Sequence, residues 1–328
     1  MAAFHEIIGH EDIIRHLKTA NKTGKISHAY LFTGSPGSGK KLMAGTFAAA
    51  LQCEKDDSWA CRECDSCRKA AAKNHPDIIT LTHEKANLIS VEEVRDQVIH
   101  DVAIRPYASP YKIYIIPDAD LMNPSAQNAI LKTIEEPPEY AVILLLTTSA
   151  QSLLPTILSR CVRLDLKVVG DRQIRRYLME QLHVADYQAD LDVSVAQGSI
   201  GRAEKAASQE FWDMAEKALN LLKRSRSMEV YELTEAIRDI AQDKQKVDEY
   251  LDLFLFWFRD ILMYKATDKQ EFLVFKQEIN AIRDESDGRS YENLEKVLNA
   301  IDKARARLHA NVNVELALEL LFMTIREV

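Results

Sequence analysis

Residues 29–40 read Ala29-Tyr30-Leu31-Phe32-Thr33-Gly34-Ser35-Pro36-Gly37-Ser38-Gly39-Lys40, a short apolar run followed by a glycine-rich turn. The apolar run is typical of a buried strand, and the alanine-rich residues 42–51 predict a helix directly after the turn. A glycine-rich turn between a strand and a helix lets backbone N–H groups and the helix N-terminus face a phosphate. We therefore predict a phosphate-binding loop in which Gly34, Gly37 and Gly39 shape the backbone and Lys40 reaches the terminal phosphates of a nucleotide.

The expected magnesium site of this loop is altered at three positions: Lys41, Pro117 and Asp118. Lys41 stands where a serine or threonine hydroxyl would bind Mg²⁺, and an ammonium group has no lone pair to offer a cation. The strand predicted at residues 113–116 should end in an acidic pair, but Pro117 replaces its first member and Asp118 its second. We expect no Mg²⁺ binding and no ATP hydrolysis by the isolated chain, although Lys40 and the loop leave ATP or ADP binding open. In the alternative, Asp118 and Asp120 complete an unusual magnesium site and the chain is an active ATPase.

Outward from the loop, the first half of the chain alternates strand and helix patterns. Three further apolar runs predict strands buried in a parallel sheet, at residues 78–81, 113–116 and 142–146. Predicted helices follow at residues 10–20 and 91–102, and after Asn123-Pro124. The capping-box spacing of Ser90 and Glu93 marks the start of the helix at 91–102. This alternation predicts a doubly wound α/β domain.

Helical periodicity replaces the strand pattern after about residue 165 and is clearest at residues 247–264 and 291–308. A chain of 328 residues is too long for one ordinary core, so several domains are expected. We predict an α/β domain at 1–165, a small helical lid at 166–209 and an all-α domain at 210–328.

Four of the five cysteines lie close together in the sequence: Cys53, Cys61, Cys64 and Cys67. Zn²⁺ takes four thiolates tetrahedrally, and such a closed site is structural because it leaves no position for a substrate. We predict a zinc module at residues 53–67, inserted in the α/β domain. An iron–sulfur cluster also needs four cysteines, but nothing in the surrounding sequence indicates redox chemistry. His75 is not needed as a ligand, and Cys161 is expected to be a separate buried thiol.

The composition is that of a globular protein, with 47% hydrophobic and 28% charged residues. No apolar run is long enough to span a bilayer, and residues 1–6 lack the pattern of a signal peptide, so we expect no membrane association and a cytoplasmic location. The net charge of −8 argues against DNA binding by the chain alone. A nucleotide-free DNA-binding scaffold is therefore a weaker alternative, which salt-sensitive DNA binding without partners would favour.

Several motifs resemble bacterial DNA polymerase III clamp-loader subunits, which are AAA+ proteins. They are Ser27-His28-Ala29-Tyr30-Leu31-Phe32, the cysteine insertion, Asn128-Ala129-Ile130-Leu131-Lys132-Thr133-Ile134-Glu135-Glu136-Pro137-Pro138 and Leu158-Ser159-Arg160-Cys161. The motor subunits of that family, tau/gamma, keep the magnesium-binding residues that are lost here. The pattern is therefore similar to the delta-prime branch of the family, and the resemblance extends over roughly residues 5–205.

The resemblance implies that Ser159 and Arg160 form an arginine finger, in which Arg160 stabilises charge on the γ-phosphate of a neighbouring subunit. The alternative role for Arg160 is an ordinary intramolecular salt bridge beside a strand. Arg202 lies in a segment that resembles a nucleotide-sensing motif, shifted by one residue from its usual register. Thr147 and Thr148 stand either at a polar sensor position or as simple strand-end hydroxyls.

The same resemblance implies an assembly. The chain would join delta and three tau/gamma subunits in a pentamer through a helical collar at 210–328. That assembly would open the beta sliding clamp and close it around primer-template DNA. The chain would belong to the polymerase III holoenzyme as a relatively rigid stator, without polymerase chemistry of its own.

Overall fold

The computed structural model describes residues 7–55, 60–85, 87–243, 246–310 and 312–327, so the predictions for residues 1–6 lie outside the described residues. The chain divides into two compact units. One comprises Met1–Tyr177 with Gln197–Arg202, and the other Leu178–Ala196 with Ala203–Val328. The three-domain division at residues 165 and 209 stays a prediction.

The first unit contains a five-stranded parallel sheet in the order β2-β3-β4-β1-β5. The strands are β1 (Ala29–Thr33), β2 (Ile78–Thr80), β3 (Lys112–Ile116), β4 (Ala141–Thr147) and β5 (Val162–Asp165). The predicted α/β fold is thus confirmed. Strand β5 is not among the predicted strands because Arg163 and Asp165 interrupt its apolar residues.

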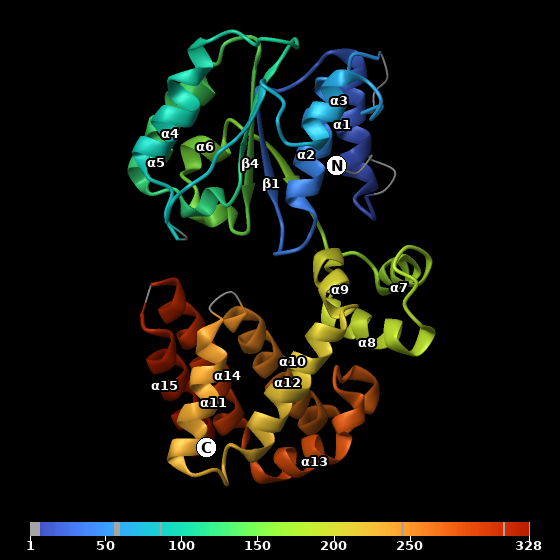
Figure 1. The fold of residues 1–328 in the computed structure, drawn as a ribbon, viewed down its shortest axis with the longest axis vertical. Helices are drawn as coiled ribbons and strands as arrows, with labels where there is room; N and C mark the ends of the chain where they lie inside the picture. Colours follow the sequence, from blue (N-terminus) through green and yellow to red (C-terminus); the bar gives the residue numbers. More distant parts are fainter. Residues whose placement is uncertain (1–6, 56–59, 86, 244–245, 311, 328) are drawn as a thin grey trace. The chain divides into compact units, whose positions relative to one another are not determined.

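Helices cover both faces of this sheet (Figure 1). On one face, Leu17 of α1 (Glu11–Thr23) and Phe47 of α2 (Lys40–Leu51) pack with alternate side chains of β1, including Phe32. On the other, Ile130 of α5 (Pro124–Glu135) and Ile157 of α6 (Pro155–Leu158) join the cluster that contains Leu31 of β1. Because both faces are covered, every residue of β1, β3 and β4 is buried, as the continuous apolar runs predict.

The helix predicted at residues 91–102 is divided in the structure. It begins as α4 (Val91–Val94) with the predicted Ser90–Glu93 capping box, and continues as the π-helix η2 (Arg95–Ile99) and the 3₁₀ turn η3 (Asp101–Ala103). Val94, Val98 and Val102 recur every four residues and are all buried. An i→i+5 turn is wider than an α-helical turn, so it keeps this four-residue spacing on one face.

The second unit is helical, as predicted for the C-terminal part of the chain. Its main helices are α10 (Gln209–Arg224), α11 (Val230–Gln242), α12 (Val247–Thr267), α13 (Ile279–Gly288), α14 (Tyr291–His309) and α15 (Val314–Glu327). The region predicted as a lid contains α7 (Asp171–Glu180), α8 (Asp186–Ala196) and α9 (Ile200–Ala206). Phe254, Phe256, Trp257 and Phe258 of α12 are at most 3% exposed, so they form core rather than a base-stacking surface. Among the described residues, no helix combines the length and apolarity needed to cross a bilayer.

Candidate functional site

The glycine-rich loop lies where the sequence predicts it, between the end of β1 at Thr33 and the start of α2 at Lys40. Gly37 and Gly39 have φ angles of 75° and 92°, in the left-handed region that side chains disfavour. A Cβ atom on Gly37 would also lie 2.5 Å from the Ser199 hydroxyl oxygen. Glycine at position 37 is therefore required both by the backbone and by a close neighbour.

Lys40 is bonded to the loop itself. Its ammonium donates to the carbonyl oxygens of Gly34 at 2.6 Å and Ser35 at 2.9 Å. Burial lowers the pKa of Lys40, while the charges of Asp120 and Asp118 act in the opposite direction. A phosphate that bound here would compete with two backbone carbonyls for this ammonium.

Lys41 and Asp118, two of the three altered positions of the magnesium site, form an ion pair. The Lys41 ammonium lies 3.3 Å from Asp118 Oδ2, and the two side chains are 70% and 44% exposed. Asp118 follows β3 and adopts a left-handed φ of 52°. The structure thus brings a cation to the carboxylate that stands at the predicted water-activating position.

Asp120 is held by the two threonines at the end of β4. The Thr147 and Thr148 hydroxyls each donate to one of its carboxylate oxygens, at 2.9 Å. The sequence suggested Asp120 as a magnesium ligand and the two threonines as sensor residues, but it did not indicate that these side chains contact one another. These bonds fix the orientation of the Asp120 carboxylate at the end of β4.

The segment Gln197–Arg202 packs directly on the loop within the same unit. The N–H of Gly201 donates to the Gly37 carbonyl at 3.0 Å, and the Ser199 hydroxyl donates to the Pro36 carbonyl at 3.2 Å. The Arg202 N–H in turn donates to the Ser199 hydroxyl oxygen at 3.3 Å. The sequence singled out Arg202 in this segment, whereas the recorded loop contacts come from the residues just before it.

Arg160 lies after α6 and its guanidinium is held by three acceptors. Nη2 lies 2.9 Å from Glu135 Oε1, and Nη1 donates to the Thr156 carbonyl at 3.0 Å and to the Ser159 hydroxyl oxygen at 3.2 Å. The side chain is still 40% exposed. The intramolecular salt bridge considered for Arg160 is therefore present, and the group also faces solvent. Glu135 was missed as a partner because the sequence places it only within the motif at residues 128–138, which carries no sign of a contact with Arg160.

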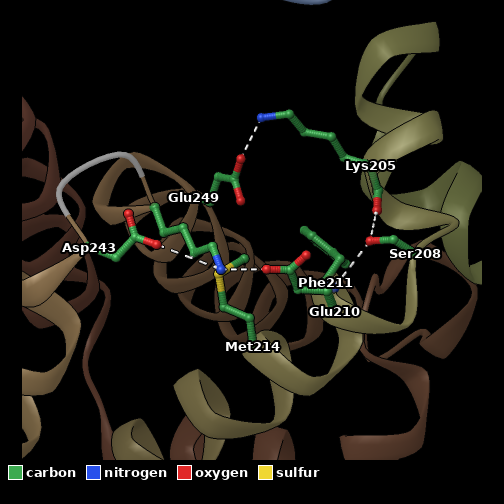
Figure 2. A pocket seen from close by; sticks show the side chains of 8 residues that line it. Lys205, Ser208, Glu210, Phe211, Met214, Asp243 and Glu249 are labelled. Carbon is green, nitrogen blue, oxygen red and sulfur yellow. Dashed lines mark hydrogen bonds and ion pairs between the residues drawn. The ribbon is translucent and has the colours of Figure 1, made fainter.

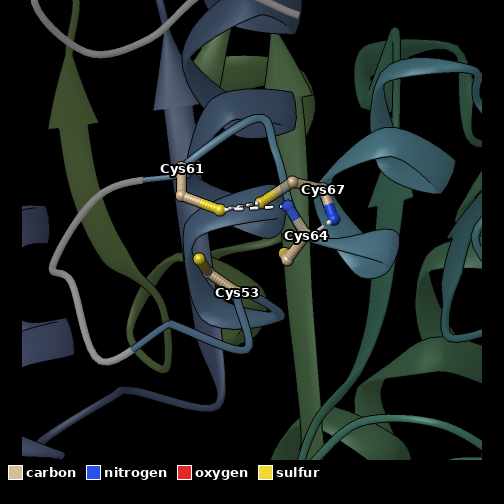
Figure 3. A group of neighbouring side chains, drawn as sticks. All are labelled: Cys53, Cys61, Cys64 and Cys67. Atoms are coloured by element: carbon tan, nitrogen blue, oxygen red, sulfur yellow. Dashed lines mark hydrogen bonds between the residues drawn. The ribbon is translucent and has the colours of Figure 1, made fainter.

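The four clustered cysteines converge, as Figure 3 shows for Cys53, Cys61, Cys64 and Cys67. Their sulfur atoms all lie within 4.8 Å of one another, and those of Cys61 and Cys67 are 3.9 Å apart. Four sulfurs at the usual Zn–S distance of about 2.3 Å form a tetrahedron with edges of about 3.8 Å. The arrangement of these thiols therefore suits a tetrahedral four-thiolate metal site.

Backbone N–H groups point at two of the sulfurs. The N–H of Cys64 donates to Cys61 Sγ and that of Cys67 to Cys64 Sγ, each at 3.3 Å. The first of these bonds lowers the pKa of Cys61 to about 6, whereas burial raises the pKa of Cys53 and Cys67. Such N–H···S bonds stabilise thiolates, the form that binds a metal.

His75 and Cys161 are not part of the cysteine cluster. His75 Nε2 lies 3.0 Å from the Ser66 hydroxyl, and its Nδ1 accepts from the N–H of Asp77 at 3.1 Å. Both ring nitrogens are thereby engaged, in line with the expectation that His75 is not a ligand. Cys161 is half-buried beside the apolar cluster of α5 and α6, and burial raises its pKa to about 11.

The helical unit contains a cavity of about 360 Å³. Figure 2 shows Phe211 and Met214 at its lining, together with charged side chains. The charged groups pair with one another: Lys205 with Glu249, and Lys246 with Glu210. Because these charges are already neutralised, the cavity does not present a charged surface of one sign to a ligand.

Comparison with known proteins adds independent evidence. Two family models match this chain. The model described as 'DNA polymerase III, delta subunit' matches residues 9–170. The model described as 'DNA polymerase III, delta subunit, C terminal' matches residues 209–327. The DNA polymerase III subunit tau of Bacillus subtilis is 31% identical over 300 residues, which are 84% of this chain and 53% of that protein. The DNA polymerase III subunit delta' of the same organism is 26% identical over 319 residues, which are 96% of this chain and 95% of that protein.

A solved structure, that of a DNA polymerase III gamma subunit-related protein from Thermotoga maritima, has the same fold. It is 21% identical, has a TM-score of 0.51, and the match covers 95% of this chain and 98% of that one. The chain spans about half the length of the tau relative but nearly all of the delta' relative. On these matches, the chain belongs to the DNA polymerase III clamp-loader subunit family and has the AAA+ fold.

Proposed function

We propose that this chain is a delta-prime-type clamp-loader subunit that does not hydrolyse ATP itself. In this role it is a rigid stator that lends Arg160, positioned with Ser159, to the ATP site of a neighbouring tau/gamma subunit. The assembly, which also includes a delta subunit, loads the beta sliding clamp onto primed DNA. The relatives described above are tau and delta' subunits of DNA polymerase III, which supports a place in such an assembly.

The ion pair between Lys41 and Asp118 carries the ATPase-deficient part of the proposal. Phosphoryl transfer needs a divalent cation that neutralises charge developing between the phosphates. A fixed ammonium 3.3 Å from Asp118 opposes a second cation at that point and neutralises the carboxylate. Two further contacts, from Lys40 to the loop carbonyls and from Gly201 to Gly37, hold the loop in its present shape. The loop residues Gly34, Gly37, Gly39 and Lys40 then retain the shape of a nucleotide site without its catalysis.

The exposure of Arg160 supports its proposed role in another subunit's site. Its three recorded contacts use three of the five N–H donors of a guanidinium, and 40% of the side chain remains exposed. A permanently charged, forked donor is suited to the γ-phosphate of an incoming neighbour. For such fingers the effect on rate is generally about 10³–10⁵.

We also propose that Cys53, Cys61, Cys64 and Cys67 bind one structural Zn²⁺. The convergence of four sulfurs within 4.8 Å supports this proposal. When bound, the ion would supply a cross-link between four points of the chain and no reactive position.

ATP hydrolysis by the isolated chain and by its assembly tests the proposal. The purified chain should show no turnover with Mg²⁺ and ATP, and Lys41→Thr alone should not restore it because Pro117 still replaces the first acidic residue. In an assembly with delta and tau/gamma subunits, Arg160→Ala should fold normally and lower both ATPase and clamp loading. Turnover by the isolated chain would identify it instead as an active motor subunit. Full activity of an assembly that contains Arg160→Ala would refute the arginine-finger role.

A further inference from the structure

We infer that Glu135 is a positioning residue for Arg160, which it holds in the orientation needed to reach a neighbour's phosphate. This inference rests on the proposed function, in which Arg160 acts in another subunit's site. It assigns a role to a carboxylate that the sequence places only within the motif at residues 128–138.

The contacts on Arg160 come from two different helices. Nη2 lies 2.9 Å from Glu135 Oε1 on α5, whereas Nη1 donates to Thr156 and Ser159 at the end of α6. Acceptors on one helix alone leave the guanidinium plane free to rotate about its own side chain. A second anchor, 25 positions earlier in the sequence and on another helix, fixes that plane.

Both anchors are attached to rigid parts of the fold. Ile134, directly before Glu135, and Ile157, three residues before Arg160, are completely buried in the same apolar cluster. The helix that carries Glu135 ends at this residue, and two prolines follow at positions 137 and 138, where they cannot continue it. The backbone positions on both sides of the ion pair are therefore set by the core.

The exposure of the Glu135–Arg160 ion pair indicates that its role is to orient the guanidinium rather than to stabilise the fold. The side chains of Arg160 and Glu135 are 40% and 39% exposed, and ion pairs at such exposure contribute little to stability. The same weakness lets a phosphate oxygen take a donor from the guanidinium without a large opposing energy. Glu135 thus limits the orientations of Arg160 before the neighbour docks, and misplacement of a catalytic group by about 1 Å can slow a reaction 10²-fold.

The test uses the reconstituted assembly of this chain with its tau/gamma and delta partners, with ATP and Mg²⁺ as substrate. Glu135→Ala should lower kcat by about tenfold with KM for ATP unchanged, a smaller loss than that of Arg160→Ala. Glu135→Gln retains an Oε1 acceptor and should restore part of the rate. Glu136→Ala is the matched control, because this neighbouring exposed carboxylate has the same charge and no recorded bond to Arg160.

The double variant separates positioning from a general structural effect. In the Arg160→Ala background, Glu135→Ala should cause no further loss, since there is no guanidinium left to orient. A loss that persists in that background would overturn the inference, as would full activity of Glu135→Ala beside an impaired Arg160→Ala. Full activity of Arg160→Ala itself would instead refute the proposed function. Should Glu135→Ala not fold, Glu135→Gln and its double variant with Arg160→Ala give the same comparison.

Discussion

Replacing Asp260 with alanine is expected to destabilise the helical unit by about 3 kcal/mol. Asp260 lies on α12, is completely buried, and its Oδ2 accepts the N–H groups of Val274 and Phe275, each at 2.8 Å. Alanine leaves two buried N–H groups without an acceptor, at about 1–3 kcal/mol each. Together the two N–H groups would cost about 2–6 kcal/mol. We expect a value in the lower half of this range, because alanine also removes a buried charge, whose burial is itself unfavourable.

The pH dependence of this effect has a definite sign. Burial raises the pKa of Asp260 from 3.8 to about 6, although the two N–H bonds act in the opposite direction. The folded state therefore binds the proton more tightly, so the contribution to stability is complete below pH 3.8 and is lost as the pH rises through 6. Relative to a side chain that is neutral at every pH, the loss of unfolding free energy is about 3 kcal/mol at pH 7 and about half of that at pH 5.

Asp260→Asn isolates the pH-dependent contribution of Asp260 to stability. An amide oxygen in the place of Oδ2 can accept both short hydrogen bonds without carrying a charge. Going from pH 7 to pH 5, the wild-type chain should gain about 1 kcal/mol of unfolding free energy relative to Asp260→Asn. Urea unfolding followed by tryptophan fluorescence measures it, since Trp212 and Trp257 both lie in the helical unit. Asp284→Asn, at an exposed position of α13, is the control. Parallel pH profiles for wild type and Asp260→Asn, or an Asp260→Ala change below about 0.5 kcal/mol, would refute the reasoning.

Three other predictions concern the α/β unit. Metal analysis of the chain, purified under reducing conditions without chelator, should give about one zinc per chain. Cys67→Ser should lower this zinc content, whereas the control Cys161→Ser should not. A metal-free wild-type chain would contradict the zinc site. Gly201→Ala should lower stability by about 1–3 kcal/mol in thermal unfolding, because its Cβ would lie 3.0 Å from the Cα of Gly37. An unchanged unfolding transition would contradict this prediction and would mean that residues 197–202 shift away from the loop without cost. Asn123→Ala should destabilise by about 1 kcal/mol in the same assay, since it removes the side-chain cap of α5, and no change would show that the cap is replaced by water.

The sequence alone determined the features that depend on neighbouring residues. The apolar runs located β1, β3 and β4, and the capping residues Ser90 and Asn123 marked helix starts that the structure confirms. The spacing of the four cysteines predicted a cluster that does converge. Such patterns can be read directly because strand burial, helix capping and thiol spacing are set within a few residues of chain.

The tertiary structure decided which distant side chains meet. It paired Lys41 with Asp118, placed the Thr147 hydroxyl on Asp120, and set Glu135 beside Arg160. Each contact joins residues at least 25 positions apart whose types are also common on exposed surfaces. A polar residue carries no periodic signal of its partner, so these pairings follow only from the order of the strands and the packing of helices on the sheet.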